Sequence, residues 1–390
     1  MKIVELTAFH VRIPLRKAIK HASHSRTETD NVLVRCVLDD GTTGFGEGVP
    51  RDYVTGETID SVLALLKSSD LASQFEDCRD FPAAVANAER LRLSPVPGNE
   101  RQCQGNAARC AVELALLDAY GRAFGASLRE VTRFAASDLF TPLDWVRYSG
   151  AITSARGFKL RLSAWAMWLF RFRQLKVKVG IAGQDDVARL RTIRKRVGAR
   201  MDLRIDANEA WTPPEAIRNI LALEPCGLTS VEQPLPHADA AALKGVRRQI
   251  KTPIMLDESL CSMYDAQRAV EMEMCDLFNL RLSKCGGFIP TLRLAQFARR
   301  HGLGYQLGCQ VGETAILSAA GRHFASSVAD IRYLEGSYDR HLVREALGTR
   351  DLTFRWGGWA PALDGAGLGV TLDPKALERV TVRKELITSC

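Results

Sequence analysis

The chain has 390 residues, of which 46% are hydrophobic and 25% charged, a composition typical of a globular protein with a sizeable core. Its formal net charge of +8 does not indicate nucleic-acid binding, because the basic residues are scattered and no motif of that class is present; a surface that attracts anionic substrates is the simpler interpretation. No apolar run approaches the roughly 20 residues of a membrane span, and the ten cysteines include no Cys-x-x-Cys pair. We therefore expect a cytoplasmic protein with reduced thiols and no zinc, membrane or nucleic-acid partner.

The first 130 residues predict an α+β unit. Alternating apolar and polar residues, typical of strands and not of a signal peptide, occupy 2–12, 31–38 and 43–47. A polar stretch, 17–30, lies between the first two strands, and from 59 to about 126 the apolar residues recur at helical spacing.

From residue 145 to about 340, short β-rich runs alternate with amphipathic helices at intervals of about 25 residues, as in parallel βαβ units. The expected strands are 146–152, 175–179, 203–206, 228–232, 254–257, 277–283, 304–307 and 331–334. Eight such strands fit a closed (β/α) barrel. An open doubly wound sheet is the alternative, although no Gly-x-Gly-x-x-Gly follows an early strand. The tail, 350–390, is expected to pack back on the N-terminal unit.

One barrel segment is unusually aromatic. Residues 164–170 read Ala-Trp-Ala-Met-Trp-Leu-Phe. We predict that this segment is buried against the barrel, with a subunit interface as the alternative.

Polar residues at the carboxyl ends of the expected barrel strands converge on one face. Asp206, Glu232 and Asp257 each close a strand, one βα unit apart. Placed together, three carboxylates repel each other unless a cation lies between them. Oxygen ligands without Cys or His favour Mg²⁺, with Mn²⁺ as the alternative cation. The competing explanation is that each acid only caps the helix that follows it.

Two lysines flank these acids. Lys178 ends the strand before Asp206, and Lys284 follows the strand after Asp257. Two amines facing each other across a metal can remove a proton from one face of a substrate and return it to the other. Alternation places Lys176 on the same side as Lys178, where it can stabilise a substrate carboxylate. Ordinary salt bridges to the acids are the alternative role for the lysines.

At these residues the sequence resembles the enolase superfamily, specifically its muconate-lactonizing-enzyme subgroup, which includes muconate cycloisomerases, o-succinylbenzoate synthases, N-acyl amino acid racemases and dipeptide epimerases. The matching segments follow the family's order over nearly the whole chain: 176–180, 204–208, 231–234, 256–259, 283–287 and 368–370.

The resemblance implies a (β/α)₇β barrel with an α+β cap built from both termini. It implies Mg²⁺ on Asp206, Glu232 and Asp257, and Lys178 and Lys284 as the acid/base pair that abstracts a proton α to a carboxylate through an enediolate. This chemistry is the general description of enolase-superfamily sites, and the spacing of the residues does not establish it by itself. Asn208 and Glu258 are expected to support the ligands.

The resemblance also points to the residues that select the substrate. Glu313 matches an acid near the substrate, and the cap loops 17–30 and 50–58 contribute His24, Arg26 and Tyr53. Dipeptide epimerases carry Asp-x-Asp at the end of strand 8, where this chain has Glu335-Gly336-Ser337. One acid is lost, which weakens a dipeptide assignment.

The expected activity is therefore racemisation, epimerisation or cycloisomerisation of a small carboxylate by a homo-oligomeric isomerase. A dehydratase of the o-succinylbenzoate synthase or acid-sugar type shares the first step and is the alternative enzyme. A non-catalytic carboxylate-binding relative is the alternative of another class, but simple binding does not need two facing lysines.

Overall fold

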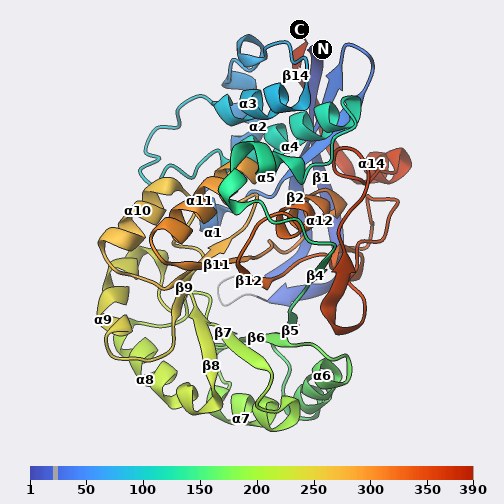
Figure 1. Ribbon diagram of the computed structural model, residues 1–390. Coiled ribbons are helices and arrows are strands. Elements are labelled where there is room, and N and C mark those ends of the chain that lie inside the picture. Colours follow the sequence, from blue (N-terminus) through green and yellow to red (C-terminus); the bar gives the residue numbers. More distant parts are fainter. Residues whose placement is uncertain (21–24, 390) are drawn as a thin grey trace.

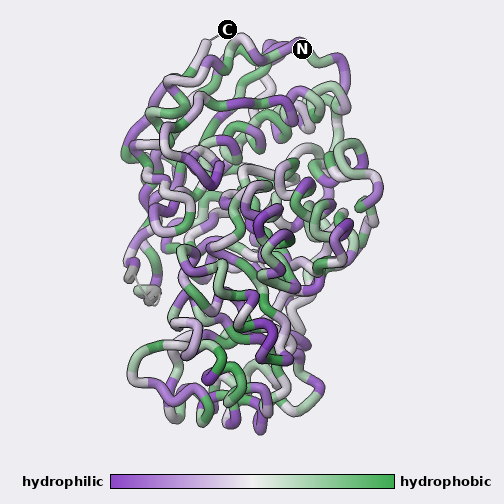
Figure 2. Tube along the Cα trace, turned by 90° about the vertical axis from the view of Figure 1, so that its left-hand side faces the viewer, coloured by the Kyte–Doolittle hydropathy of each residue, from purple (hydrophilic) through white to green (hydrophobic). Residues whose placement is uncertain are grey.

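A four-stranded antiparallel sheet forms the core of the cap in the computed structural model, which describes residues 1–20 and 25–389. The strand order is β14-β1-β2-β3, so the last strand of the chain pairs with the first. The bounds are β1 (Ile3–Lys20), β2 (Ser25–Leu38), β3 (Thr43–Gly48) and β14 (Thr381–Ser389). In the side view, both termini lie together at the cap end of the molecule (Figure 2).

Helices cover this sheet and connect it to the second part of the chain (Figure 1). They are α1 (Asp52–Thr55), α2 (Ile59–Ser68), α3 (Phe81–Arg90), α4 (Asn106–Ala123) and α5 (Glu130–Ala135). Thr58 and Asp80 cap α2 and α3 by accepting hydrogen bonds from backbone amides in the first turns.

Helix α4 lies unusually close to β3, because β3 carries glycine at every second position. A Cβ on Gly46 would lie 1.9 Å from the Ala111 carbonyl oxygen, and one on Gly44 would lie 2.1 Å from the Ala119 amide nitrogen. No side chain fits in this space, so glycine is required for the contact between helix and strand.

The second part is an eight-stranded parallel sheet in sequential order, curled into a barrel. The edges meet where the Ser149 amide donates to the Leu334 carbonyl at 2.8 Å. The strands are β5 (Gly150–Ile152), β6 (Gln174–Lys178), β7 (Asp202–Asp206), β8 (Leu228–Glu232), β9 (Ile254–Leu256), β10 (Leu277–Leu280), β11 (Gly304–Leu307) and β12 (Ile331–Leu334).

Helices follow the first seven of these strands. They are α6 (Gly157–Leu169), α7 (Asp186–Val197), α8 (Pro213–Leu223), α9 (Leu243–Arg247), α10 (Met263–Glu271), α11 (Phe288–Arg300) and α12 (Ala315–Ala325). The predicted (β/α)₇β barrel with an α+β cap is confirmed.

Two details differ from the sequence prediction. The expected single strand 146–152 is two strands, because β4 (Trp145–Arg147) pairs outside the barrel with β13 (Trp359–Pro361). After β12 the chain forms α13 (Asp339–Leu342), and α14 (Pro374–Val380) precedes the final strand.

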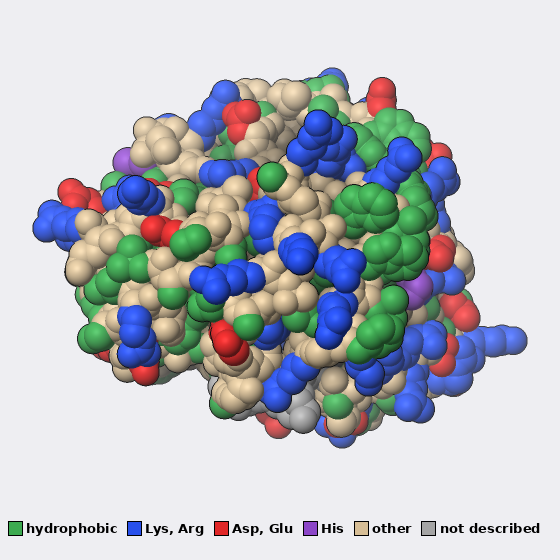
Figure 3. Space-filling model, turned by 90° about the horizontal axis from the view of Figure 1, so that it is seen from below, with side chains coloured by type: hydrophobic (Ala, Val, Ile, Leu, Met, Phe, Trp, Pro, Cys, Tyr) green, Lys and Arg blue, Asp and Glu red, His purple; other side chains and the backbone are tan. Residues whose placement is uncertain are grey.

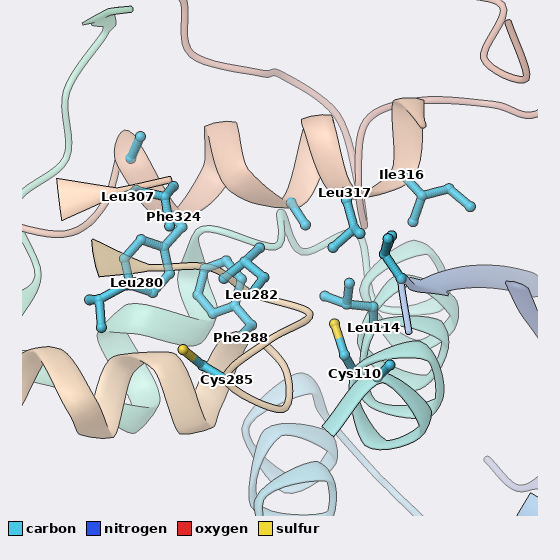
Figure 4. Packing of buried hydrophobic residues seen from close by; sticks show 14 of the residues in the cluster. Cys110, Leu114, Leu280, Leu282, Cys285, Phe288, Leu307, Ile316, Leu317 and Phe324 are labelled. Atoms are coloured by element: carbon cyan, nitrogen blue, oxygen red, sulfur yellow. The ribbon is translucent and has the colours of Figure 1, made fainter. Parts of the chain in front are cut away.

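One apolar core runs from the cap into the barrel. Cys110 and Leu114 of α4 point toward Leu282 and Phe288 at the edge of the barrel (Figure 4). The cap is thus packed on the barrel through buried hydrophobic surface.

The prediction that residues 164–170 are buried is wrong. Only Ala164 is fully buried, whereas Trp165, Trp168 and Phe170 are 47%, 53% and 45% exposed. The segment belongs to an outer barrel helix, which has only one side against the barrel, so the remaining aromatic side chains face outward.

The nine cysteines of the described chain form no disulfide, and eight of them are buried. In the same residues, no helix combines the length and the apolar character needed to cross a membrane.

Candidate active site

The predicted site residues lie side by side at the carboxyl ends of five consecutive barrel strands. Lys178 on β6 is in register with Asp206 on β7, and Asp206 with Glu232 on β8. Asp257 directly follows β9, and Lys284 follows β10. The two lysines therefore stand at the two ends of this arc, with the three acids between them.

Shared cations connect the three carboxylates. Lys176 Nζ lies 3.5 Å from Asp206 Oδ2 and 3.4 Å from Glu232 Oε2. Arg281 pairs with Asp257, and its Nη2 lies 3.7 Å from Glu232 Oε1. All three acids are buried. The acids thus form one cluster, in which each carboxylate shares a positive partner with the next.

These acids fit a hard divalent cation by their chemistry, since the three neighbouring carboxylates offer only oxygen donors and no thiolate or imidazole accompanies them. In the chain as described, no group of three or more His, Cys, Asp or Glu side chains is drawn together closely enough to enclose an ion. Here Lys176, Arg281 and Lys284 supply the positive charge around them.

Burial and the surrounding charges shift the pKa values of Asp206 and Glu232 in opposite directions. Burial opposes ionisation of Asp206, but Lys176, Lys178 and Arg281 together hold its pKa below the ordinary value. Burial raises the pKa of Glu232, and the nearby Asp206 charge adds to this increase. The surrounding cations therefore outweigh burial at Asp206 but not at Glu232.

The two candidate bases have different surroundings. Lys178 Nζ donates to Asn208 Oδ1 at 2.6 Å. Lys284 is completely enclosed and donates to the carbonyl oxygens of Asp257 and Asn279 at 2.7 and 2.9 Å, and to Asp257 Oδ1 at 3.0 Å. Burial lowers the pKa of Lys284, which favours its neutral form.

Lys176 is held by Glu335, which directly follows strand β12. Its Nζ lies 2.8 Å from Glu335 Oε2, and Arg204 Nη2 lies 2.6 Å from the other oxygen, Oε1. Burial opposes ionisation of Glu335, but Lys176 and Arg204 overcome it and hold the pKa at about 2. Glu335 is therefore a carboxylate that two cations already neutralise.

The two residues expected to support the ligands meet behind Asp206. The Asn208 side-chain amide donates to Glu258 Oε1 at 3.5 Å, and the Asn208 backbone amide donates to Asp206 Oδ1 at 3.0 Å. Burial raises the pKa of Glu258 to about 8. Asn208 and Gln233, just after β7 and β8, have positive φ angles of 45° and 38°. Such left-handed backbone at non-glycine residues is strained and is common at functional sites.

The cap contributes a basic and aromatic group. The Arg26 guanidinium lies 5.5 Å from the centre of the Tyr53 ring, and Tyr53 packs on a small cluster with Val54, Cys103 and Cys261. Cys261 belongs to the loop that follows β9, so Tyr53 lies next to that loop. His24, the other predicted cap residue, lies outside the described residues.

Glu313 lies at the junction of cap and barrel. Its carboxylate accepts a hydrogen bond from the Gln310 backbone amide at 2.6 Å. Burial raises the pKa of Glu313 to about 8. Glu313 and Glu335 line one cavity together with Cys309 and Ser337. The two acids predicted to contact substrate therefore share a single space beside β12.

Sequence reasoning missed three residues of this site. Arg204 lies two residues before Asp206, so strand alternation alone places it on the same face. Asn279 donates to Glu232 Oε1 at 2.8 Å and accepts from Lys284. Arg281 follows the end of β10, and no strand periodicity indicates that it pairs with Asp257.

Two family models match this chain. Residues 160–376 match the family model described as enolase C-terminal domain-like, and residues 3–131 match the N-terminal domain of the mandelate racemase / muconate lactonizing enzyme model. Together the two matches span most of the cap and nearly all of the barrel.

Three similar proteins illustrate the range of sequence identity and coverage. An L-Ala-D/L-Glu epimerase of Clostridium acetobutylicum is 33% identical over 331 residues, which cover 84% of this chain and 87% of that protein. An N-succinyl-L-Arg/Lys racemase of Bacillus cereus is 26% identical over 99% of this chain and all of its own length. The crystal structure of a dipeptide epimerase from Cytophaga hutchinsonii, complexed with Mg and D-Ala-L-Val, has 25% identity and a TM-score of 0.84 over the full length of both chains.

Proposed function

The chain belongs to the mandelate racemase / muconate lactonizing enzyme family and is an enzyme of its isomerase type, and on this basis we propose that it racemises or epimerises an N-acylated α-amino acid. Lys178 and Lys284 are the proposed acid/base pair. Asp206, Glu232 and Asp257 are the proposed holders of Mg²⁺, which the similar Cytophaga enzyme binds.

The placement of the two lysines carries this proposal. Lys178 lies on the first strand of the five-strand arc and Lys284 follows the last one, on either side of the carboxylates. A substrate held between them presents one face of its α-carbon to each amine. Inversion at carbon requires a base on one face and an acid on the other, and this arc provides both.

The surrounding residues fit a carboxylate substrate. Bound Mg²⁺ would supply positive charge that stabilises the negative charge developing on the substrate carboxylate. Lys176 adds a buried ammonium on the same side of β6 as Lys178. The neutral form of one lysine accepts the α-proton, and the protonated form of the other donates a proton to the opposite face.

The substrate class follows from Glu335 and Ser337. Both oxygens of Glu335 are engaged by Lys176 and Arg204, and the Ser337 hydroxyl lies 2.8 Å from the Tyr148 hydroxyl. Glu335 therefore offers no unneutralised carboxylate to a free ammonium group. An amino acid whose nitrogen is acylated needs none, so it fits better than a dipeptide with a free N-terminus.

The test is exchange of the α-proton in D₂O, followed by NMR. We expect deuterium at the α-carbon of N-succinyl or other N-acyl amino acids, loss of exchange with EDTA and recovery with Mg²⁺. Exchange only with free dipeptides would contradict the substrate class. Loss of water from a hydroxylated substrate, without such exchange, would assign lyase chemistry instead.

Variants of the lysines test the roles directly. Lys178→Ala and Lys284→Ala should each abolish interconversion of the two stereoisomers and exchange of the one whose α-proton faces the missing amine, whereas Mg²⁺ should still raise the unfolding temperature of both. Lys375→Ala, at an exposed lysine of α14, is the control and should leave the rate unchanged. Near-normal interconversion of the stereoisomers in either active-site variant would refute the two-base assignment.

A further inference from the structure

The turn that carries Lys284 is held by the cap as well as by the barrel. Lys284 follows β10, and residues 281–287 lead from the end of this strand to α11. The Lys284 carbonyl oxygen accepts a hydrogen bond from the side-chain amide of Asn106, the first residue of the cap helix α4, at 2.6 Å. The backbone of one proposed acid/base residue is therefore bound directly by a residue of the cap.

Two further residues of α4 bind the same turn. Arg109 donates to the Gly286 carbonyl at 2.8 Å, and Glu113 accepts from the Ile289 amide at 3.0 Å. Asn106, Arg109 and Glu113 follow each other at intervals of three and four residues, so they share one face of the helix. Figure 4 shows α4 lying beside this turn. One face of α4 is thus fitted to the chain segment that holds the lysine.

Asn106 also binds the loop that follows β9. Its side-chain nitrogen donates to the Cys261 carbonyl at 2.7 Å, and the same loop contains Asp257. The position of Asn106 is fixed by Glu57, whose two carboxylate oxygens accept from the Ala107 amide at 3.0 and 3.1 Å. One amide group therefore connects the loop of a proposed metal ligand to the turn of a proposed base.

Lys178 is supported differently. Its carbonyl oxygen accepts from Arg189 Nη1 at 3.0 Å, and Arg189 belongs to the barrel helix α7. Its amine donates to Asn208, which follows the barrel strand β7. These contacts of Lys178 lie within the barrel, whereas the backbone of Lys284 is bound from the cap.

We propose that Asn106 is a positioning residue for Lys284, through which the cap controls proton transfer on one face of the substrate. This inference rests on the proposed two-lysine function. Asn106 acts through the backbone of Lys284, and a misplacement of about 1 Å can cost about 100-fold in rate. Loss of the Asn106 amide should therefore impair proton transfer by Lys284 and spare proton transfer by Lys178.

Asn106→Asp tests this inference with almost no change of shape. The new carboxylate has the size of the amide but no hydrogen to donate, so it places negative charge beside two carbonyl oxygens. Helix α4 is not weakened by the substitution, because negative charge at the N-terminus of a helix interacts favourably with the helix dipole. The variant thus removes the proposed contact without removing the helix that provides it.

Asn219→Asp is the matched control. Asn219 lies in α8, at the end of the barrel away from the cap (Figure 1), and a helix tolerates Asn and Asp about equally. Lys and Arg side chains are abundant on the face seen from below (Figure 3), so an added negative charge is not repelled there. This variant should leave both stereoisomers unaffected.

The measurement is deuterium incorporation with retained configuration, for each pure stereoisomer of an N-succinyl amino acid in D₂O. The stereoisomer that Lys284→Ala fails to exchange is the one whose α-proton faces Lys284. We expect Asn106→Asp to slow exchange of this stereoisomer by about 10- to 100-fold, and to leave the other within about twofold of the wild-type rate. Equal slowing of both stereoisomers, or no slowing of either, would overturn the proposal.

Amide hydrogen exchange followed by mass spectrometry gives a readout that needs no substrate. The backbone amides of 281–289 should exchange faster in Asn106→Asp than in wild type, whereas those of 174–180 should not change. A wild type that exchanges the α-proton of neither stereoisomer would refute the proposed function. Faster amide exchange confined to 281–289 would then still support the contact between Asn106 and the turn, and unchanged amide exchange there would overturn it.

Discussion

Lys176 and Glu335 form a buried ion pair of 2.8 Å between β6 and the end of β12. Arg204 binds the second oxygen of the same carboxylate. Arg204 therefore holds Glu335 in place, and Glu335 in turn positions Lys176. Residues that orient a functional group in this way commonly change activity by about 10- to 100-fold when replaced.

Glu335→Gln should therefore lower the kcat/KM of α-proton exchange by about 10- to 100-fold, because a neutral amide no longer balances Lys176 and Arg204. The rate of deuterium incorporation measures this loss. Glu345→Gln, which alters a surface ion pair with Arg379, is the control. An unchanged rate in the Glu335 variant would mean that Lys176 is positioned without it.

Arg281→Met should destabilise the metal-free protein more than the Mg²⁺-loaded one. Arg281 neutralises Asp257 and approaches Glu232, and breaking a buried ion pair costs about 3–5 kcal/mol. Thermal unfolding with and without Mg²⁺ should show a larger stabilisation by the metal in the variant than in wild type. The same stabilisation by Mg²⁺ in both would separate Arg281 from the carboxylate cluster.

Glu47→Gln should remove a pH dependence from folding stability. Glu47 joins the cap to α12, accepting hydrogen bonds from the Thr314 amide at 2.9 Å and the Leu317 amide at 3.0 Å. Burial raises its pKa from 4.5 to about 7, so its contribution to stability is complete below pH 4.5 and is lost as the pH rises through 7.

The measurement is urea unfolding between pH 4.5 and 7.5. The free energy of unfolding of wild type relative to the variant should fall by about 3 kcal/mol across this interval. Glu313 also has a raised pKa, of about 8, but it is present in both proteins, so its own titration cancels in the difference to first order. A constant difference across the interval would refute the assignment to Glu47.

Gly46→Ala should destabilise the protein by about 1–3 kcal/mol or more, because the new methyl group would collide with the Ala111 carbonyl of α4. Gly245→Ala is the control, since Gly245 lies in α9 with open space around it. Chemical denaturation should show a loss in the first variant and a neutral or small stabilising change in the second. Equal effects would mean that α4 can move away from β3.

The barrel and the three acids were predictable because both depend on local periodicity. Apolar strands recur at a constant interval, and parallel strands bring their carboxyl ends to one edge. Asp206, Glu232 and Asp257 close three such strands, so their positions along the chain already imply neighbouring positions in space. The roles proposed for Lys178 and Lys284 depended on the same regularity together with the family resemblance.

The pairing of Glu335 with Arg204 could not be predicted in this way, because the two residues are 131 positions apart and meet only when the barrel closes. The exposure of α6 was also hidden, since hydrophobic composition does not reveal which sides of a helix the rest of the chain covers. The order of the strands and the chemical groups at their ends can thus be read from the amino-acid sequence alone. Which charges neutralise one another, and which apolar surface stays uncovered, became visible in the folded chain, because both depend on distances between segments that share no local pattern.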